Sequence, residues 1–324
     1  MSVQRLVLRL AAATLMLGAV YLLLGQLVPG AWTRLRRIDP GWIAVAVALE
    51  VMSLTGYAAL FHAVFSRDPV RLSRSRSAQV AVGELGGFAL VPTGLGGPAL
   101  RFWALRRSGM SLRTLIVRTI AHAPIFNVPY VAAAIVLGAA ALLHLGSGRA
   151  PVALAVAPAA LVIIAVSITL AVLAAGRRGR PRGAARWRQL VRAGIAIAPD
   201  GLRDARSLLR SSVALLGACA YWAGDCGVLW ATTQGLGAGA PLQVVVLAYM
   251  LGQLGNVLPL PGGVGGVEPA TVGVLTASGV GLAPAAAAVL CYRAVSLGMQ
   301  GVGGTIAFAT LLGADRRATT SPSA

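Results

Sequence analysis

The sequence predicts an all-α integral membrane protein with six full transmembrane helices and two Gly/Pro-broken re-entrant hairpins, arranged as a 3+3 inverted repeat. The composition, the spacing of the long apolar runs and an internal repeat support this fold class. Of the 324 residues, 57% are hydrophobic and 11% are charged, whereas soluble domains carry about 25% charged residues. Because such a chain cannot cover its surface with polar groups in water, the composition excludes soluble enzymes, disordered regulators and secreted disulfide scaffolds.

Six apolar segments are long enough to cross a bilayer, whose core of ~30 Å needs ~20 residues per helix. They are residues 6–28, 41–65, 114–145, 150–175, 211–233 and 281–312. The first segment follows basic residues, as a signal peptide would. It is longer than a typical signal segment and lacks a clear cleavage site, so we expect it to be a retained span.

Two further apolar segments are interrupted near their middles. Residues 78–100 and 241–279 both contain Gly and Pro where a simple helix would continue. Pro removes a backbone donor and Gly loosens the backbone, so neither segment favours one unbroken helix. We expect each to be a re-entrant hairpin that enters and leaves the membrane on one side.

The arginines predict the orientation of the chain. All 28 basic residues are arginines, and the formal net charge is +19. With the N-terminus in the cytoplasm and both broken segments as hairpins, 22 arginines fall in cytoplasmic stretches and four on the opposite side. This bias follows the positive-inside rule. It predicts a multi-pass protein of the cell (cytoplasmic) membrane with both termini cytoplasmic, rather than a protein that binds nucleic acid.

The basic segment 176–210 is expected to be a cytoplasmic linker between spans. Its mixture of arginines with residues such as Trp187 and Leu190 leaves two interpretations open. It is either a solvated linker or an interfacial helix that lies on anionic lipid headgroups. Residues 316–324 are expected to form a disordered tail.

An internal repeat links the two broken segments. Residues 83–97 and 252–266 both fit G-x-L-G-x5-P-x-G-x-G-G without a gap. The order of spans also repeats, which divides the chain into halves 1–149 and 150–315. With three full spans per half, the second copy must insert upside down, and broken helices at matching positions then indicate a central transport site. The alternative is that these glycines only let helices pack closely.

Ionisable residues within apolar spans are costly and usually functional. The candidates are Glu50, Glu84, Arg118, His122, Asp225, Glu268 and Arg293, with Arg101 at the end of the first broken segment. We expect Arg118 to pair with Glu84, and Arg293 with Glu268. The alternative is that the charged residues form purely structural ion pairs. His122 is expected to be a hydrogen-bonded core histidine.

Arginines beside glycine-rich breaks suit a lipid phosphate headgroup, because a guanidinium grips phosphate with two donors and half-helix ends expose backbone N–H groups. The candidate substrate-binding residues are Arg101, Arg118, Arg293, Glu268, Glu84, Asp225, Gly94, Gly96, Gly262, Gly263, Gly265 and Pro261. The sequence has no H-E-x-x-H pattern, Walker loop or Ser/His/Asp arrangement, and its three cysteines have no metal-type spacing. We therefore expect no catalytic residues, metal or cofactor.

Residues 258–280, LPLPGGVGGVEPATVGVLTASGV, followed by an arginine in the next span, resemble the C-terminal signature of a family of flippase-like membrane proteins. That family includes the transmembrane region of lysylphosphatidylglycerol synthases. The matching residues are Pro259, Pro261, Gly262, Gly263, Gly265, Glu268, Gly279 and Arg293. The first half is similar to the family's upstream motif at Gly94, Arg101, Gly109 and Arg118, but Gly97-Pro98-Ala99-Leu100-Arg101 lacks the acid that the family usually places there.

The resemblance implies that a phospholipid or polyprenyl-linked lipid, with an aminoacyl or sugar headgroup, moves across the bilayer. Synthase members carry a cytosolic aminoacyltransferase domain after the membrane part, which we do not expect within these 324 residues. Two other functions stay open. One is proton-coupled secondary transport of a small anion, and the other is a non-transporting subunit that anchors a separate cytosolic glycosyltransferase or aminoacyltransferase.

Overall fold

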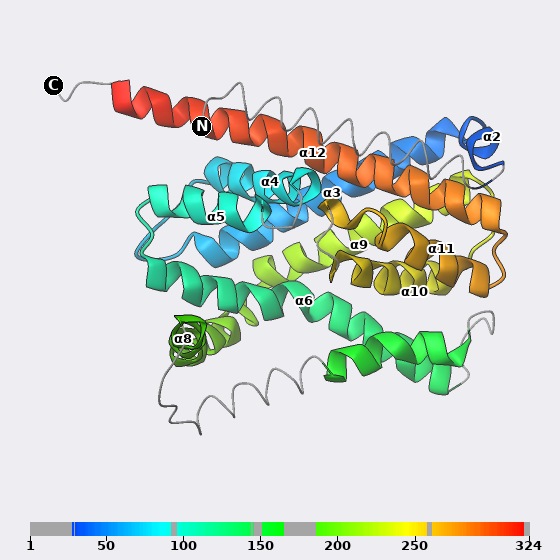
Figure 1. The fold of residues 1–324 in the computed structure, drawn as a ribbon, viewed down its shortest axis with the longest axis horizontal. Helices are drawn as coiled ribbons and strands as arrows, with labels where there is room; N and C mark the ends of the chain where they lie inside the picture. The colour runs from blue at the N-terminus through cyan, green and yellow to red at the C-terminus, as the bar shows by residue number, and fades with distance from the viewer. Residues whose placement is uncertain are drawn as a thin grey trace.

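All regular secondary structure is helical in the residues that the computed structural model describes, namely 28, 30–91, 96–143, 145, 151–164, 186–257 and 261–320. Within these described residues, four helices are long and apolar enough to cross a membrane (Figure 1). They are α3 (Pro40–Phe65), α6 (Leu112–Leu142), α9 (Ser212–Gly235) and α12 (Leu282–Thr320). The chain is therefore a multi-pass membrane protein, and these helices match four of the predicted spans.

The other predicted elements are described in part. Of the predicted span 6–28 only Val28 is described, and of 150–175 the structure shows a helix at Val152–Ile164, beyond which residues 165–175 lie outside the described part. The tail was expected to be disordered from residue 316, but α12 continues to Thr320. Residues 321–324 are not described.

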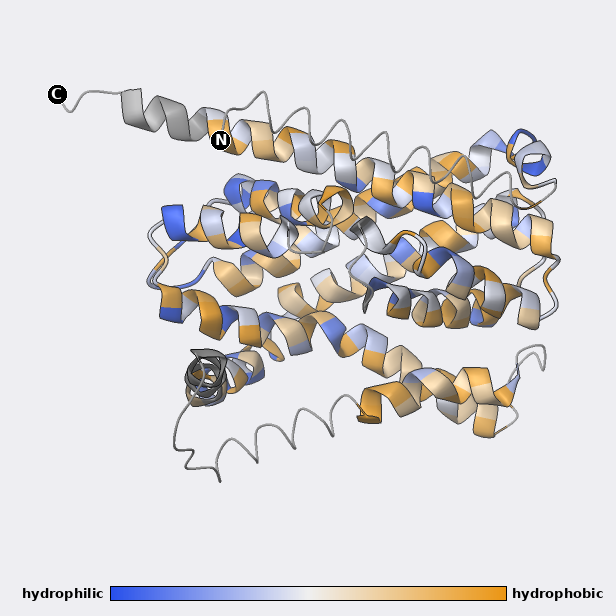
Figure 2. Cartoon of the chain, viewed as in Figure 1, coloured by the Kyte–Doolittle hydropathy of each residue, from blue (hydrophilic) through white to orange (hydrophobic). Residues whose placement is uncertain are grey.

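The long helices begin at polar caps that the sequence supplies. The Asp39 carboxylate accepts a hydrogen bond from the Gly41 N–H at the start of α3. The Ser111 hydroxyl accepts a hydrogen bond from the Thr114 N–H at the start of α6, and the Ser211 hydroxyl accepts one from the Ala214 N–H at the start of α9. Such caps satisfy N–H groups that have no partner within the helix. Figure 2 shows hydrophobic residues along the long helices, and hydrophilic residues at the left ends of α5 and α6 and around α2 (Ala31–Leu35).

The centre of the molecule is the tightly packed pair α3 and α9 (Figure 1). A methyl group added to Gly56 of α3 would lie 2.7 Å from the Ala220 Cβ of α9, and one added to Gly217 would lie 2.7 Å from the Gly56 carbonyl oxygen. Small residues of this kind let membrane helices approach to backbone contact. The pair thus forms a scaffold on which the broken segments are mounted.

Each broken segment folds as two short antiparallel helices. In the first, α4 (Arg74–Leu90) and α5 (Gly96–Arg107) run side by side, with the Gly97 backbone against the Glu84 carbonyl oxygen. In the second, α10 (Leu242–Gln253) packs against α11 (Val267–Ala277). Two short 3₁₀ turns, η1 (Leu254–Val257) and η2 (Pro261–Gly263), lie between α10 and α11. The two pairs lie in opposite halves of the view in Figure 1.

Helix α12 connects the halves, because it packs against α4, α9 and α11. Its closest approach is to α4, where the Gly86 and Gly304 backbones touch. The glycines of the repeat therefore do serve close packing, as one interpretation of the sequence proposed. That packing brings polar residues of α12 next to both broken segments.

Part of the basic linker is the helix α8 (Arg186–Leu208), which packs on α6. Asp200 pairs with Arg113 at 2.5 Å, and Asp204 pairs with Arg67 at 2.6 Å. The acids of α8 are thus used to fix it to the rest of the protein. The segment is not merely a solvated linker in the residues that are described.

Candidate functional site

The second broken segment holds a buried ion pair between two elements. Arg293 of α12 donates from Nε to Glu268 Oε1 of α11 at 2.9 Å, and both side chains are 5% exposed. A second guanidinium nitrogen of Arg293 donates to the Gly262 carbonyl oxygen. The predicted pair is therefore present, and it joins the break itself to α12.

Local backbone geometry explains why this segment is rich in glycine. Gly262, Gly263 and Gly265 have φ values of +55°, +69° and +87°, in the left-handed region that side chains disfavour. These turns aim the Gly265 N–H at Glu268 Oε2, at 2.7 Å. Glu268 lies in the first turn of α11, where the helix dipole favours an acid. Pro261 begins the 3₁₀ turn that precedes these glycines.

An apolar cavity of about 260 Å³ adjoins the ion pair. Gly265 and Glu268 form its polar end, and the rest is hydrocarbon. The lining residues are Val28, Gly265, Glu268, Pro269, Val272, Ala286, Val289 and Leu290. The Glu268 carboxylate therefore belongs both to the ion pair at the break and to the lining of the apolar cavity. An amphipathic molecule could place its headgroup and its chain in these two environments at once.

The first broken segment holds a different pair from the one expected. Glu84 of α4 pairs with Arg101 of α5 at 2.9 Å, so the predicted pairing of Glu84 with Arg118 is wrong. The reason is the tight α4–α5 hairpin, which places Gly97 against Glu84 and Arg101 one turn further along. Arg101 also lies over the Phe65 ring, 5.6 Å from its centroid. Gly96 begins α5, whereas Gly94 lies outside the described residues.

Arg118 instead holds the end of α3. Its guanidinium donates to the carbonyl oxygens of Phe65 at 2.7 Å, Arg67 at 2.9 Å and Asp68 at 2.7 Å. Backbone carbonyls at a helix C-terminus lack partners within the helix, so a cation there satisfies them. This geometry gives Arg118 a structural role at the end of the helix.

The two breaks meet each other. A methyl group on Gly262 would lie 3.4 Å from the Ala89 carbonyl oxygen, near the end of α4. Ala89 and Leu90 also form a buried cluster with Val264 and Leu297. The end of α4 and the 3₁₀ turn η2 are therefore in contact. The arrangement brings Gly262 and Arg293 close to the first broken segment.

Asp225 of α9 lies at the centre of a hydrogen-bond network. Its carboxylate accepts from the hydroxyls of Tyr249 at 2.7 Å, Tyr292 at 3.1 Å and Ser296 at 2.9 Å. Asp225 is recognisable in the sequence as an acid within an apolar span, but its hydroxyl partners are not, because single neutral polar residues in apolar runs carry little signal. Tyr292, Ser296 and Gln300 are spaced four residues apart in the last apolar span, which places them on one face of a helix. This spacing is the sequence feature that indicates a polar network there.

His122 behaves as the core histidine that was expected in packing, though not in hydrogen bonding. Its ring stacks on that of Phe126, with the ring centroids 5.6 Å apart, and meets the Tyr57 ring edge-on, with the centroids 5.9 Å apart. Its Nε2 atom has no hydrogen-bond partner among the described residues. In the same part of the chain, no group of three or more His, Cys, Asp or Glu residues could hold a metal ion.

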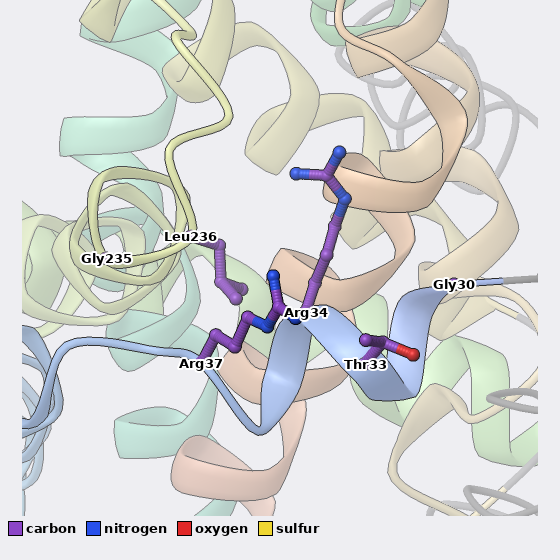
Figure 3. Close-up of a pocket in the computed structure, with 6 residues that line it drawn as sticks. All are labelled: Gly30, Thr33, Arg34, Arg37, Gly235 and Leu236. Carbon is purple, nitrogen blue, oxygen red and sulfur yellow. The ribbon is translucent and has the colours of Figure 1, made fainter.

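A second cavity, of about 430 Å³, lies beside α2 and is open and basic. Figure 3 shows Arg34 and Arg37 projecting from α2 and the turn after it, with Leu236 close to Arg37. The remaining lining residues are Gly30, Thr33 and Gly235. Two guanidinium groups at an open pocket form a surface that attracts anions.

The chain matches the family model described as the lysylphosphatidylglycerol synthase TM region over residues 6–304. Among curated proteins, none matches the chain. The family match spans both broken segments, α12 as far as residue 304, and the Arg293–Glu268 pair. This protein therefore belongs to the family of the lysylphosphatidylglycerol synthase TM region.

Proposed function

We propose that this protein translocates a phospholipid or a lipid-linked headgroup, aminoacyl- or glyco-, across the cell membrane. The observation that carries the proposal is the position of Glu268, which pairs with the buried guanidinium of Arg293 and also lines an apolar cavity. A lipid needs a cationic site for its phosphate and a hydrocarbon groove for its chain. Membership of a family related to phospholipid handling supports the same substrate class.

Arg293 is the proposed phosphate ligand. Its guanidinium already contacts one carboxylate oxygen and one backbone carbonyl, and a phosphate offers the same acceptor chemistry with more charge. A phosphate that displaces Glu268 keeps the buried cation paired, whereas an empty site restores the ion pair. The exchange keeps the Arg293 guanidinium paired, since a buried unpaired charge costs several kcal/mol. The released Glu268 carboxylate keeps the hydrogen bond from the Gly265 N–H.

The membrane topology is part of the proposal. Helices α4, α5, α10 and α11 have 17, 12, 12 and 11 residues. At 1.5 Å per residue these are ~16–26 Å long, shorter than the ~30 Å hydrocarbon core. We infer that each pair is a re-entrant hairpin, that the two halves form an inverted repeat, and that both termini and residues 176–210 are cytoplasmic.

The topology has a direct test by labelling. Cysteines introduced singly at Arg180 and Gly237, in a background without native cysteines, should react with a membrane-impermeant thiol reagent from opposite sides of sealed vesicles. Inverting the vesicles should exchange which of the two positions reacts with the reagent. Labelling of both from the same side would contradict the inverted arrangement of the halves.

The function itself has a direct test by reconstitution. The full chain in liposomes should accelerate the transfer of a fluorescent phosphatidylglycerol between leaflets, read as the fraction that an impermeant reductant quenches. The exposed Arg71 supplies a matched control, because Arg71→Lys should transfer lipid at the wild-type rate. A wild-type rate equal to that of empty liposomes, for both phosphatidylglycerol and a polyprenyl phosphate, would contradict lipid translocation.

A further inference from the structure

Two buried carboxylates lie next to the proposed lipid site without taking part in it. Glu50 of α3 and Asp225 of α9 are linked through α12, because Gln300 Nε2 donates to Glu50 Oε1 at 3.2 Å and to Ser296 Oγ at 3.1 Å. Ser296 in turn donates to Asp225 Oδ1 at 2.9 Å. Neither the proposed phosphate exchange at Arg293 nor the packing of α3 on α9 requires this polar chain.

The two carboxyl groups have opposite surroundings. Asp225 accepts three hydroxyl hydrogen bonds, which stabilise an ionised carboxylate. Glu50 is fully buried, and its Oε2 atom has no hydrogen-bond partner among the described residues. An isolated buried carboxylate oxygen is costly, whereas a neutral acid is tolerated. Paired acids in unlike surroundings divide in this way into one ionised and one neutral group.

A second buried oxygen lies on the same face of α3. Ser53 follows Glu50 by three residues, is fully buried, and its Oγ also has no partner in the described part of the chain. Residues three apart are neighbours on a helix surface. The two buried oxygens therefore share one face of α3, and neither is hydrogen-bonded to the other or to another described group.

Helix α9 packs closely against this face of α3. A methyl group on Gly224 of α9 would lie 2.6 Å from the Leu49 carbonyl oxygen and 2.9 Å from the Ser53 Cβ. The α9 backbone is thus in contact with α3 at Leu49 and Ser53, the turn that carries Glu50.

We propose that Glu50 and Asp225 form a proton-binding site, in which Glu50 Oε2 takes up one proton from water and returns it to water. Four titratable or charged groups face the pair: Tyr221 of α9, Tyr249 of α10, and Tyr292 and Arg293 of α12. Two further groups, Glu84 of α4 and His122 of α6, lie toward Tyr57, two turns further along α3. No other reactant is required.

The proton site is connected to the lipid site through α12. Arg293 faces Asp225 as well as Glu268, and Tyr292, Ser296 and Gln300 lie on successive turns of the same helix. With every group ionised, the three carboxylates of Glu50, Asp225 and Glu268 and the guanidinium of Arg293 have a net charge of −2. An anionic phosphate at Arg293 adds negative charge, so proton uptake and phosphate binding favour each other, and the coupling is reciprocal. This coupling rests on the proposed function, whereas the proton site does not.

Infrared difference spectroscopy of the full chain in lipid nanodiscs tests the proton site. The wild type should show the C=O stretching band of a protonated carboxylic acid that disappears on alkalinisation. Glu50→Gln should abolish this band, and Glu84→Gln, the same change in another buried acid, should retain it. A band that persists unchanged in Glu50→Gln, or is missing from the wild type at low pH, would overturn the proposal.

A second variant covers the case in which Glu50→Gln does not fold. Gln300→Met removes the donor to Glu50 Oε1, so the band should move to the higher frequency of an acid without that hydrogen bond. An unmoved band would count against Glu50 as the proton carrier. In liposomes, lipid transfer should respond to an imposed pH gradient in the wild type and lose that response in Glu50→Gln. A Glu50-dependent band without lipid transfer would overturn the function and leave the proton site in place.

Discussion

The two broken segments share one sequence pattern but make their ion pairs differently. In the first, Glu84 and Arg101 belong to the two helices of a single hairpin, and their side chains are 10% and 13% exposed. In the second, Glu268 lies in the hairpin but Arg293 comes from α12, and both side chains are 5% exposed. A pair within one hairpin stabilises the contact between the two helices of that hairpin. A pair between the hairpin and α12 can also transmit a change from one to the other.

The backbones at the two breaks differ as well. Gly262, Gly263 and Gly265 all have positive φ and aim a backbone N–H at Glu268. The corresponding residues of the first segment include Gly96, which begins α5 and packs against Val91. The repeat therefore preserves the place of the break and not the contacts made there. We infer that phosphate binding belongs to the second segment.

The largest effect is expected from Gly263→Leu. Its φ of +69° disfavours a side chain, and a Cβ there would collide with the Asn256 amide oxygen. Lipid transfer in liposomes should be abolished while membrane insertion is retained. Gly273→Leu is the matched control, because nothing lies within 4 Å of a Cβ at that position of α11. Full activity of Gly263→Leu would mean that the break only serves helix packing.

Lysine substitutions at Arg293 and Arg101 should reduce lipid transfer to different extents. Arg293→Lys keeps the charge but loses the two-pronged grip on phosphate. A lost hydrogen bond to a charged group is worth ~1.5–3 kcal/mol, so transfer should fall about 10- to 100-fold. Arg101→Lys changes a hairpin pair that lies outside the proposed phosphate site, so its rate should fall less than about threefold. Equal losses in the two variants would remove the asymmetry between the segments.

A smaller effect on transfer, but a clear effect on stability, is expected from Arg118→Ala. The substitution removes the shared donor of three backbone carbonyls, of which that of Phe65 is buried and those of Arg67 and Asp68 are partly buried. The loss should lower the free energy of unfolding by about 3 kcal/mol. Lipid transfer per folded molecule should stay close to wild type. Unfolding in mixed micelles measures the first quantity. The exposed Arg203 is the control, because Arg203→Ala should change stability by less than about 0.5 kcal/mol.

The sequence predicts the membrane fold and the pair at the second break because both follow from strong local signals. Long apolar runs require helices, and the glycines and prolines mark where they end. The partner of Glu84 could not be predicted, because it depends on how closely α4 and α5 pack at Gly97. The network around Asp225 was missed for a related reason. Its donors Tyr249 and Ser296 become significant only when three helices bring them to one carboxylate.

The double variant Arg293→Gln with Glu268→Gln tests the central claim most directly, with lipid transfer in liposomes as the measurement. The variant removes both charges of the pair and keeps side chains of similar size, so no unpaired charge is left in the membrane. If Arg293 binds the lipid phosphate, the double variant inserts and folds but remains as inactive as Arg293→Gln alone. If Arg293 serves only as the partner of Glu268, removing both charges restores transfer, and that recovery would contradict the phosphate site.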